Sequence, residues 1–360
     1  MKKDRLVRLQ RAMAERQLDA VVLVPGPNLY YFTRLAMHLS ERITLAVVPV
    51  NGEPEFVAPR LEATRIQVIT GVTTVHAYSD EEGPMAAVGR ALTGRKRLGV
   101  EFRYMRLLEH QYVAATVGGP LIDAGEIFAA LRMRKSAEEI ELMREAARIV
   151  DAGTAAAAAT IAAGVTELEV ADAIERAMKA EGGRGLGITV LSGPKGALPH
   201  GQTGDRVIGQ GELVVVDLVG SYQGYYADIT RTFPVGSISG QLREIYEVCY
   251  RGQAAARAAA RPGISGEALD ETARTVIRDA GFGEYFTHRT GHGLGLEVHE
   301  EPYIVRGNRA LLELGMAFTI EPGIYLPGVG GVRIEDDVVI TPEGAETLTR
   351  YPRELRPQEV

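Results

Sequence analysis

Four carboxylates and one histidine in the second half of the chain form a pattern that could bind metal ions. Each acid ends or interrupts an apolar run typical of a buried strand, as Leu213 to Val216 runs into Asp217. An ionised carboxylate placed there is costly unless a cation meets it. The five side chains of ligand type are Asp217, Asp228, His292, Glu321 and Glu335. One such acid alone would usually be a strand-end cap or a surface charge. Because two matched pairs of acids occur with a histidine, we interpret the five side chains as ligands of two divalent metal ions.

The segments that carry these acids look duplicated. Gly164-Val-Thr166 and Gly263-Ile-Ser265 each place a helix N-cap residue after a glycine, and helical apolar spacing follows both. The alternative is a chance likeness of two amphipathic helices. We predict instead two related halves, each with helices followed by a strand hairpin that offers two inward acids about a pseudo-twofold axis. The same offset along the chain links His200 with His299, and slightly larger offsets link Asp217 with Glu321 and Asp228 with Glu335.

The ligand chemistry narrows the choice of metal. Oxygen donors dominate the set, with one imidazole and no thiolate, which favours Mn²⁺, with Co²⁺ or Zn²⁺ as the alternatives. The glycines around His292 in Thr290-Gly-His-Gly-Leu-Gly allow the backbone to approach the ions closely.

Further basic side chains lie next to the ligand segments. His288 and His299 flank His292, and His200 lies before Asp217, so we expect them to take part in proton transfer or oxyanion binding, His299 above all. The alternative for each is a structural histidine. Arg333 precedes Glu335 on the same face of a predicted strand and would clamp a ligand carboxylate, unless it forms only a surface ion pair.

Bulk composition excludes several classes of protein. The chain has 360 residues, enough for two domains, and a net charge of −7, which argues against a nucleic-acid binder. Its single cysteine, Cys249, excludes a disulfide framework and a thiolate metal cluster. We find no apolar stretch of the length that a membrane span or a signal peptide needs. We therefore expect a cytoplasmic protein without a nucleic-acid or membrane partner.

Two domains are predicted along the chain. Residues 1–125 alternate helix and strand patterns, typical of an α/β domain, and Val24-Pro-Gly-Pro27 lacks both the glycine pattern of a phosphate loop and a following helix. A capping box, Ser136-Ala-Glu-Glu139, opens a long helix in the second domain, residues 126–360. The polar tail from Tyr351 to Val360 is expected to be loosely ordered at its end.

The ordered motifs resemble the pita-bread metallopeptidases, in particular the Xaa-Pro peptidases prolidase and aminopeptidase P. The resemblance is most specific in the second domain and extends weakly to Pro27-Asn-Leu-Tyr-Tyr-Phe-Thr in the first. It implies a creatinase/prolidase-like α/β N-terminal domain and an α+β pita-bread catalytic domain with an internal pseudo-twofold duplication. The motifs are His200-Gly, Asp217 with Asp228-Ile-Thr-Arg-Thr-Phe, Thr290-Gly-His292-Gly-Leu-Gly-Leu-Glu-Val-His299-Glu, Ile320-Glu321-Pro-Gly-Ile-Tyr and Val332-Arg333-Ile-Glu335-Asp.

The resemblance implies dinuclear hydrolysis of the bond before proline, in a peptide with proline at its second position. Asp217 would chelate one ion, His292 and Glu321 the other, and Asp228 and Glu335 would bridge them. Glu321 would also shuttle a proton. The resemblance also implies that His299 and His288 stabilise the developing oxyanion or hold the substrate. It implies that His200 helps to close the site over the proline ring. A homodimer is expected.

One departure from the family pattern leaves the substrate open. Prolidases that resemble this chain carry an arginine just after the His-Glu-Glu-Pro run, where this sequence has Tyr303. We predict that Arg42, rather than Arg34, supplies the missing cation for a dipeptide's carboxylate. The alternatives are an aminopeptidase P that acts on longer Xaa-Pro-Yaa peptides, a hydrolase or lyase for a small non-peptide substrate on the same fold, and a non-catalytic peptide-binding module. The complete ligand set argues against the last of these.

Overall fold

The computed structural model describes residues 2–355, and the chain divides into two compact units after Arg132. The end of the predicted catalytic domain and of the tail, residues 356–360, lies outside the described residues, as does Met1. Within the described residues, no helix is long and apolar enough to cross a bilayer.

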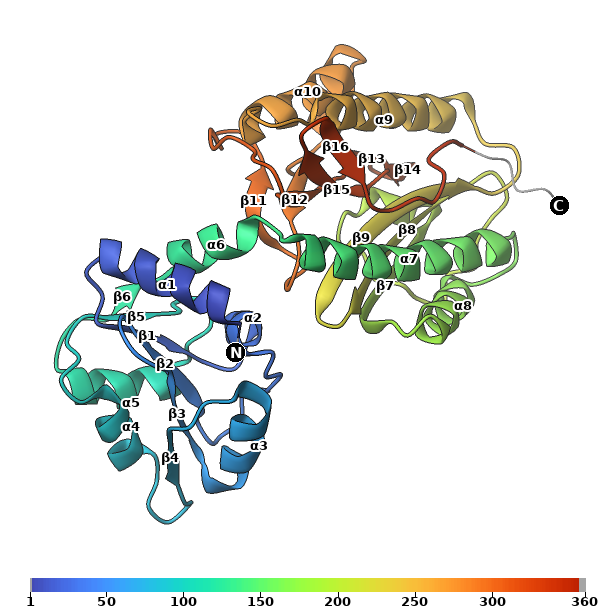
Figure 1. Ribbon diagram of the computed structural model, residues 1–360. Coiled ribbons are helices and arrows are strands. Elements are labelled where there is room, and N and C mark those ends of the chain that lie inside the picture. Colours follow the sequence, from blue (N-terminus) through green and yellow to red (C-terminus); the bar gives the residue numbers. More distant parts are fainter. Residues whose placement is uncertain (1, 356–360) are drawn as a thin grey trace. The chain divides into compact units, whose positions relative to one another are not determined.

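The first unit is built on a mixed six-stranded sheet in the order β4-β3-β2-β1-β5-β6 (Figure 1). Strand β1 pairs antiparallel with β2 and parallel with β5, and its four residues are all buried. The elements are α1 (Lys3–Glu15), β1 (Ala20–Leu23), α2 (Pro27–Thr33), β2 (Leu45–Pro49), β3 (Glu55–Pro59), α3 (Arg60–Thr70), β4 (Val75–Tyr78), α4 (Met85–Leu92), β5 (Leu98–Val100), α5 (Leu107–Val117), β6 (Ile122–Asp123) and α6 (Gly125–Met133).

One sequence expectation for the first unit is wrong. A short helix, α2, does follow Gly26, and Pro27 opens it, where a missing backbone N–H leaves no hydrogen bond unmade. The glycine pattern of a phosphate loop is still absent from the sequence there.

The second unit places helices α7 and α8 on one side of its strands and α9 and α10 on the other (Figure 1). Its sheets are β7-β8-β9, β11-β10-β12-β15-β16 and the ribbon β13-β14. The elements are α7 (Ala137–Thr160), α8 (Glu167–Ala180), β7 (Arg184–Ser192), the 3₁₀ turn η1 (Gly193–Ala197), β8 (Leu213–Tyr222), β9 (Tyr225–Pro234), α9 (Gly240–Ala259), α10 (Gly266–Asp279), η2 (Gly283–Tyr285), β10 (Gly291–Gly293), β11 (Glu300–Ile304), β12 (Ala317–Ile320), β13 (Gly323–Leu326), β14 (Gly330–Arg333), β15 (Asp336–Thr341) and β16 (Gly344–Thr347).

The two halves of this unit repeat the same local structure. Thr166 caps α8 by accepting from the Glu169 amide, and Ser265 caps α10 by accepting from the Ala268 amide. Each cap residue also forms an isolated antiparallel bridge further along its own half, Thr166 with Val207 and Ser265 with Leu311. The duplication read from the sequence is therefore present in the backbone hydrogen bonds.

The second acid pair differs from the predicted hairpin. Asp217 and Asp228 lie on the directly connected strands β8 and β9. Glu321, by contrast, follows β12, and Glu335 precedes β15, so the ribbon β13–β14 is inserted between them. Strands β12 and β15 still pair antiparallel, with Ile320 opposite Asp336, and this pairing brings the two acids together.

A buried arginine connects the strands of the two halves. Arg231 on β9 donates to the backbone carbonyl of Glu335 and forms a 2.7 Å ion pair with Asp336 on β15. It also donates to the carbonyls of Tyr351 and Pro352. Asp336 accepts further from Gln253 at 2.6 Å and from Arg353. A buried charge held by this many partners fixes β9 against β15, which carry or adjoin ligand candidates from both halves.

Arg231→Met should destabilise the second unit by about 3 kcal/mol or more, because it removes a donor from four backbone carbonyls and weakens the neutralisation of Asp336. Urea unfolding followed by circular dichroism measures the change. The matched control is Arg278→Met, which removes an exposed ion pair with Glu271 and should change stability by less than about 0.5 kcal/mol. Equal midpoints for the two variants would contradict the structural role given to Arg231.

Candidate metal centre

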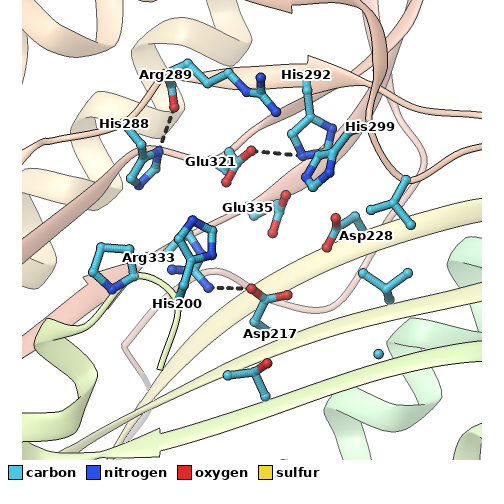
Figure 2. A pocket seen from close by; sticks show the side chains of 15 residues that line it. His200, Asp217, Asp228, His288, Arg289, His292, His299, Glu321, Arg333 and Glu335 are labelled. Carbon is cyan, nitrogen blue, oxygen red and sulfur yellow. Dashed lines mark hydrogen bonds and ion pairs between the residues drawn. The ribbon is translucent and has the colours of Figure 1, made fainter. Parts of the chain in front are cut away.

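A single cavity of about 600 Å³ in the second unit brings the predicted site residues together (Figure 2). All five candidate ligands line it, and so do the three candidate catalytic histidines and Arg333. The lining residues are Gly187, Thr189, Pro199, His200, Asp217, Val219, Asp228, His288, Arg289, His292, Val298, His299, Glu321, Arg333 and Glu335.

Strand pairing places the first two acids on one face. In the antiparallel pair β8–β9, Asp228 lies opposite Val219, whose side chain shares a face with Asp217. Both carboxylates therefore enter the cavity from the same side of the sheet, as Figure 2 shows. The local sequence alternates so that apolar neighbours such as Leu218 and Ile229 pack into the core on the other face.

Three of the five candidate ligands lie close enough to one another to share a metal ion. One ligand atom from each of Asp228, His292 and Glu335 lies within 4.8 Å of the other two, and all three residues are buried. Glu321 lies beside this trio, with its Oε1 atom 3.1 Å from Nε2 of His292. Asp217 lines the same cavity, but its carboxylate is ion-paired with Arg333.

The orientation of His292 suits a metal ligand. Its Nδ1 atom lies 3.1 Å from the carbonyl oxygen of Gly293, which can only accept, so Nδ1 carries the proton. The Nε2 lone pair of a neutral ring then faces Glu321, and this arrangement needs a proton or a cation in addition. A histidine that donates one ring N–H to a backbone carbonyl and presents the other nitrogen is the usual arrangement at protein metal sites.

The electrostatics of the acids also favour a cation. Burial, together with the charge of Asp217, raises the pKa of Asp228 well above its ordinary value. Burial and the charge of Asp228 do the same to the pKa of Glu335. Atom Oδ1 of Asp228 is buried without a hydrogen-bond partner. Bound divalent ions would supply the missing partner and remove the repulsion, so the residues fit such ions.

Glu321 behaves differently from the other acids. Burial alone would raise its pKa, but the hydrogen bond and the charge of His292 lower the pKa of Glu321 to about 2. Thr319 donates to Oε1 of Glu321 at 3.1 Å and accepts from the His292 amide. In the other half, Thr230 donates to Oε2 of Glu335 at 2.6 Å. Two threonines thus orient two acids, and their place on the ligand strands is a signal that the sequence analysis did not use.

Arg333 is held on several sides. It pairs with Asp217, donates to the hydroxyl of Tyr325 at 2.9 Å and donates to Oγ1 of Thr230 at 3.1 Å. The arginine is buried and lines the same cavity, and its ion pair is with Asp217 rather than with Asp228 or Glu335. Its contacts fix the position of the Asp217 carboxylate.

The three histidines differ in how they are bound. Nδ1 of His288 lies 2.7 Å from the carbonyl of Arg289 and must donate to it, so Nε2 accepts from the Tyr325 hydroxyl at 2.8 Å. Burial lowers the pKa of His288, which keeps the ring neutral near pH 7. The exposed ring of His299 lies edge-on to His292, with centroids 4.2 Å apart. His200 is exposed in the loop after η1.

Two buried acids outside the ligand set hold the histidine-bearing loops, and the sequence analysis missed both. Glu167 accepts from the amide and hydroxyl of Ser192, each at 2.9 Å, and pairs with Lys195, so it fixes the segment leading to His200. Asp270 accepts from the amide and hydroxyl of Thr290 at 3.0 and 2.8 Å. Each acid lies near the start of the second helix of its half, Glu167 directly after the cap Thr166 and Asp270 further from the cap Ser265.

The two residues predicted to concern the substrate's carboxylate lie in different units. Tyr303 on β11 faces His292 across the strand pair β10–β11, and the guanidinium of Arg289 lies 4.4 Å from the centre of its ring. Arg42 belongs to the first unit, where Asp80 binds it through two hydrogen bonds of 2.7 and 2.9 Å and Glu41 through a third. Its charge is therefore already balanced there.

Comparison with known proteins identifies the class. The family model of metallopeptidase family M24 matches residues 141–342, and that of the creatinase/prolidase N-terminal domain matches residues 5–134. The chain belongs to metallopeptidase family M24. The predicted pita-bread catalytic domain behind a creatinase/prolidase-like α/β domain is confirmed, and so is the prediction of a metallopeptidase that uses divalent metal ions.

The relatives narrow the class further. The chain is 39% identical over 356 residues to the probable dipeptidase PepE of Mycobacterium tuberculosis, which covers 98% of this chain and 95% of that protein. It is 36% identical to the Xaa-Pro dipeptidase of Pyrococcus furiosus, over 98% of this chain and 99% of that protein. The crystal structure of the prolidase from Pyrococcus horikoshii matches with a TM-score of 0.91 and 34% identity, over 98% of this chain and 100% of that one.

Asp228→Asn should stabilise the metal-free protein and weaken its response to metal. The pKa of Asp228 is raised in the fold, so the metal-free wild type should lose stability as pH rises above about 4, the ordinary carboxyl value. At pH about 7.5 the metal-free variant should melt higher, by about 2–4 °C for each kcal/mol of repulsion removed. Thermal melts in EDTA and in Mn²⁺ measure both effects.

The control for this prediction is Asp172→Asn, which changes an exposed acid on α8 and should alter neither melt. Two results together would show that Asp228 is not a metal ligand. The metal-free Asp228→Asn variant would be no more stable than the metal-free wild type, and Mn²⁺ would stabilise both proteins equally.

Proposed function

We propose that this protein hydrolyses the peptide bond before proline in Xaa-Pro dipeptides with the help of two divalent metal ions. The observation that carries the proposal is the convergence of five ligand-type side chains and three histidines on one cavity of the M24 domain. The relatives named Xaa-Pro dipeptidase and prolidase, which cover nearly the whole chain, support the substrate class.

The ligand roles follow from the positions of the acids. In the proposed arrangement Asp228 and Glu335, each with one ligand atom within 4.8 Å of a ligand atom of His292, would serve both ions. His292 and Glu321 would hold one ion, and Asp217 the other. Manganese is the first choice because carboxylate donors dominate, and Co²⁺ or Zn²⁺ are the alternatives. Bound ions would supply the Lewis acidity that amide hydrolysis requires.

The remaining side chains would position the substrate and move protons. Glu321, whose Oε1 atom lies 3.1 Å from Nε2 of His292 at the cavity wall, would accept a proton during bond cleavage. His299 is the best placed to bind the developing oxyanion, because its ring adjoins His292 and is exposed to the cavity. His200 lies on the cavity wall and would cover the proline ring.

His288 supports the site in a different way from the one the resemblance implies. Both of its ring nitrogens are engaged, with Arg289 and Tyr325, so it has no N–H left for the substrate. We propose that it orients the Tyr325 hydroxyl, which also accepts from Arg333. Arg333 in turn keeps the Asp217 carboxylate in place.

Two further proposals concern the state of the protein in the cell. We propose a cytoplasmic homodimer, and the free, buried Cys249 is compatible with a reducing compartment. Analytical ultracentrifugation would test the dimer.

The second candidate function is an aminopeptidase P activity on longer Xaa-Pro-Yaa peptides, which the tyrosine at position 303 favours.

The defining experiment is the release of free proline from Xaa-Pro dipeptides by metal-free protein supplied with Mn²⁺, Co²⁺ or Zn²⁺. We expect metal-dependent release from dipeptides and slower cleavage of Xaa-Pro-Yaa tripeptides. Faster cleavage of the tripeptides would favour the aminopeptidase reading. Absence of activity on both substrates with a full complement of metal would overturn the proposal.

His299→Ala should lower kcat by on the order of 10²-fold, as loss of an oxyanion or proton-transfer group does. Its metal content, measured by mass spectrometry, should stay close to that of the wild type. A purely structural histidine would show the opposite pattern, with a lower melting temperature and nearly unchanged turnover at low temperature.

A further inference from the structure

The metal cavity contains a cation that the sequence analysis did not single out. Two arginines line it, Arg289 and Arg333. Arg333 is committed to Asp217, Tyr325 and Thr230. Within residues 2–355, no carboxylate lies within ion-pair distance of the Arg289 guanidinium, so its charge is available to a ligand.

Tyr303 fixes where this charge stands. Strand pairing sets Tyr303 directly opposite His292, so the two side chains share a face of the strand pair β10–β11. The guanidinium of Arg289 lies over the tyrosine ring, 4.4 Å from its centre, in a cation–π contact. Figure 2 shows the Arg289 side chain extending past Glu321 toward His292. The cation is thus held beside the candidate metal ligands by an aromatic ring rather than by an acid.

A dipeptide substrate needs a cation at such a place. Its free carboxylate lies one residue beyond the scissile bond, so it enters the same cavity as the carbonyl that is attacked. A carboxylate that loses water there is stabilised by a guanidinium, which can donate two parallel hydrogen bonds to it. Arg333 is occupied, and both ring nitrogens of His288 are engaged with Arg289 and Tyr325. The guanidinium of Arg289 is therefore the cationic group lining the cavity that meets this need.

We propose that Arg289, positioned by Tyr303, binds the free carboxylate of the dipeptide and thereby sets the preference for dipeptides over longer chains. The proposal rests on the proposed Xaa-Pro hydrolysis and adds to it a specificity-determining residue. A tyrosine at position 303 then does not remove the carboxylate contact, because its ring supports an arginine supplied from the neighbouring segment of the same cavity.

The test compares an Xaa-Pro dipeptide with its C-terminal amide, which has the same side chains and no negative charge. Arg289→Gln should raise KM for the dipeptide by on the order of 10²-fold, with KM for the amide changed by less than about threefold. The wild type should therefore prefer the acid to the amide, and the variant should lose that preference. Equal losses on both substrates, or none on either, would overturn the proposal.

Two other arginines serve as controls. Arg306→Gln removes an exposed arginine whose nearest acid, Glu271, is 3.7 Å away, and it should leave both KM values unchanged. Arg42→Ala tests the earlier prediction, and a dipeptide-selective loss in this variant rather than in Arg289→Gln would overturn the assignment to Arg289. A wild type that releases proline from neither substrate would instead count against the proposed function itself.

Tyr303 is tested as a positioning residue. Tyr303→Phe keeps the ring and should retain the preference for the acid over the amide. Tyr303→Ala removes the ring and should raise KM for the dipeptide by about 3- to 10-fold with little effect on kcat, as loss of a cation–π contact does. A fall in kcat on both substrates for Tyr303→Ala would show a general structural role and contradict the positioning role.

Discussion

Repulsion among buried carboxylates is the constraint on which the second unit depends. Burial and mutual charge raise the pKa of both Asp228 and Glu335, and an oxygen of Asp228 lacks any partner. A fold cannot keep such groups together unless other interactions hold the strands in place. Arg231 does so between β9 and β15, and Arg333 does so beside Asp217. The unfavourable contacts that remain are those that a divalent ion relieves, so affinity for metal is built into the unliganded fold.

The duplication explains how one chain positions so many side chains at once. Each half uses a capped helix, a buried acid near that helix's start and a loop that carries histidine. Glu167 anchors the segment before His200, and Asp270 anchors the turn before His292. Because both acids are satisfied by amides, hydroxyls or cations, they rigidify their loops without competing for metal. The ligands can then converge from separate strands with little freedom left to lose.

The sequence was sufficient to pick out the five ligand-type side chains that meet in one cavity, because charged residues at the ends of apolar runs are conspicuous. The domain types followed from the order of the motifs. Helix α3 escaped prediction because Leu61 and Val68 are exposed on it, so it shows no clear apolar stripe. The ribbon β13–β14 was predicted only in part, because a strand was expected through Arg333 and Glu335 but β14 ends at Arg333. The short strand β13 resembles a loop in the sequence. The contact between Arg289 and Tyr303 depends on the register of β10 and β11, which no local pattern reveals.

That register connects chemistry with specificity. His292 and Tyr303 are cross-strand partners, so one set of backbone hydrogen bonds positions both a candidate metal ligand and the ring beneath Arg289. Gly291 and Gly293 let β10 approach both of its neighbours closely. A Cβ at Gly291 would meet the backbone oxygen of Thr319 on β12, and a Cβ at Gly293 would meet that of Glu301 on β11. In the proposed arrangement, the distance between the metal site and the carboxylate-binding cation is therefore set by the backbone. A carboxylate one residue from the scissile bond would reach that cation from the same cavity, and the carboxylate of a longer peptide would lie further along the chain.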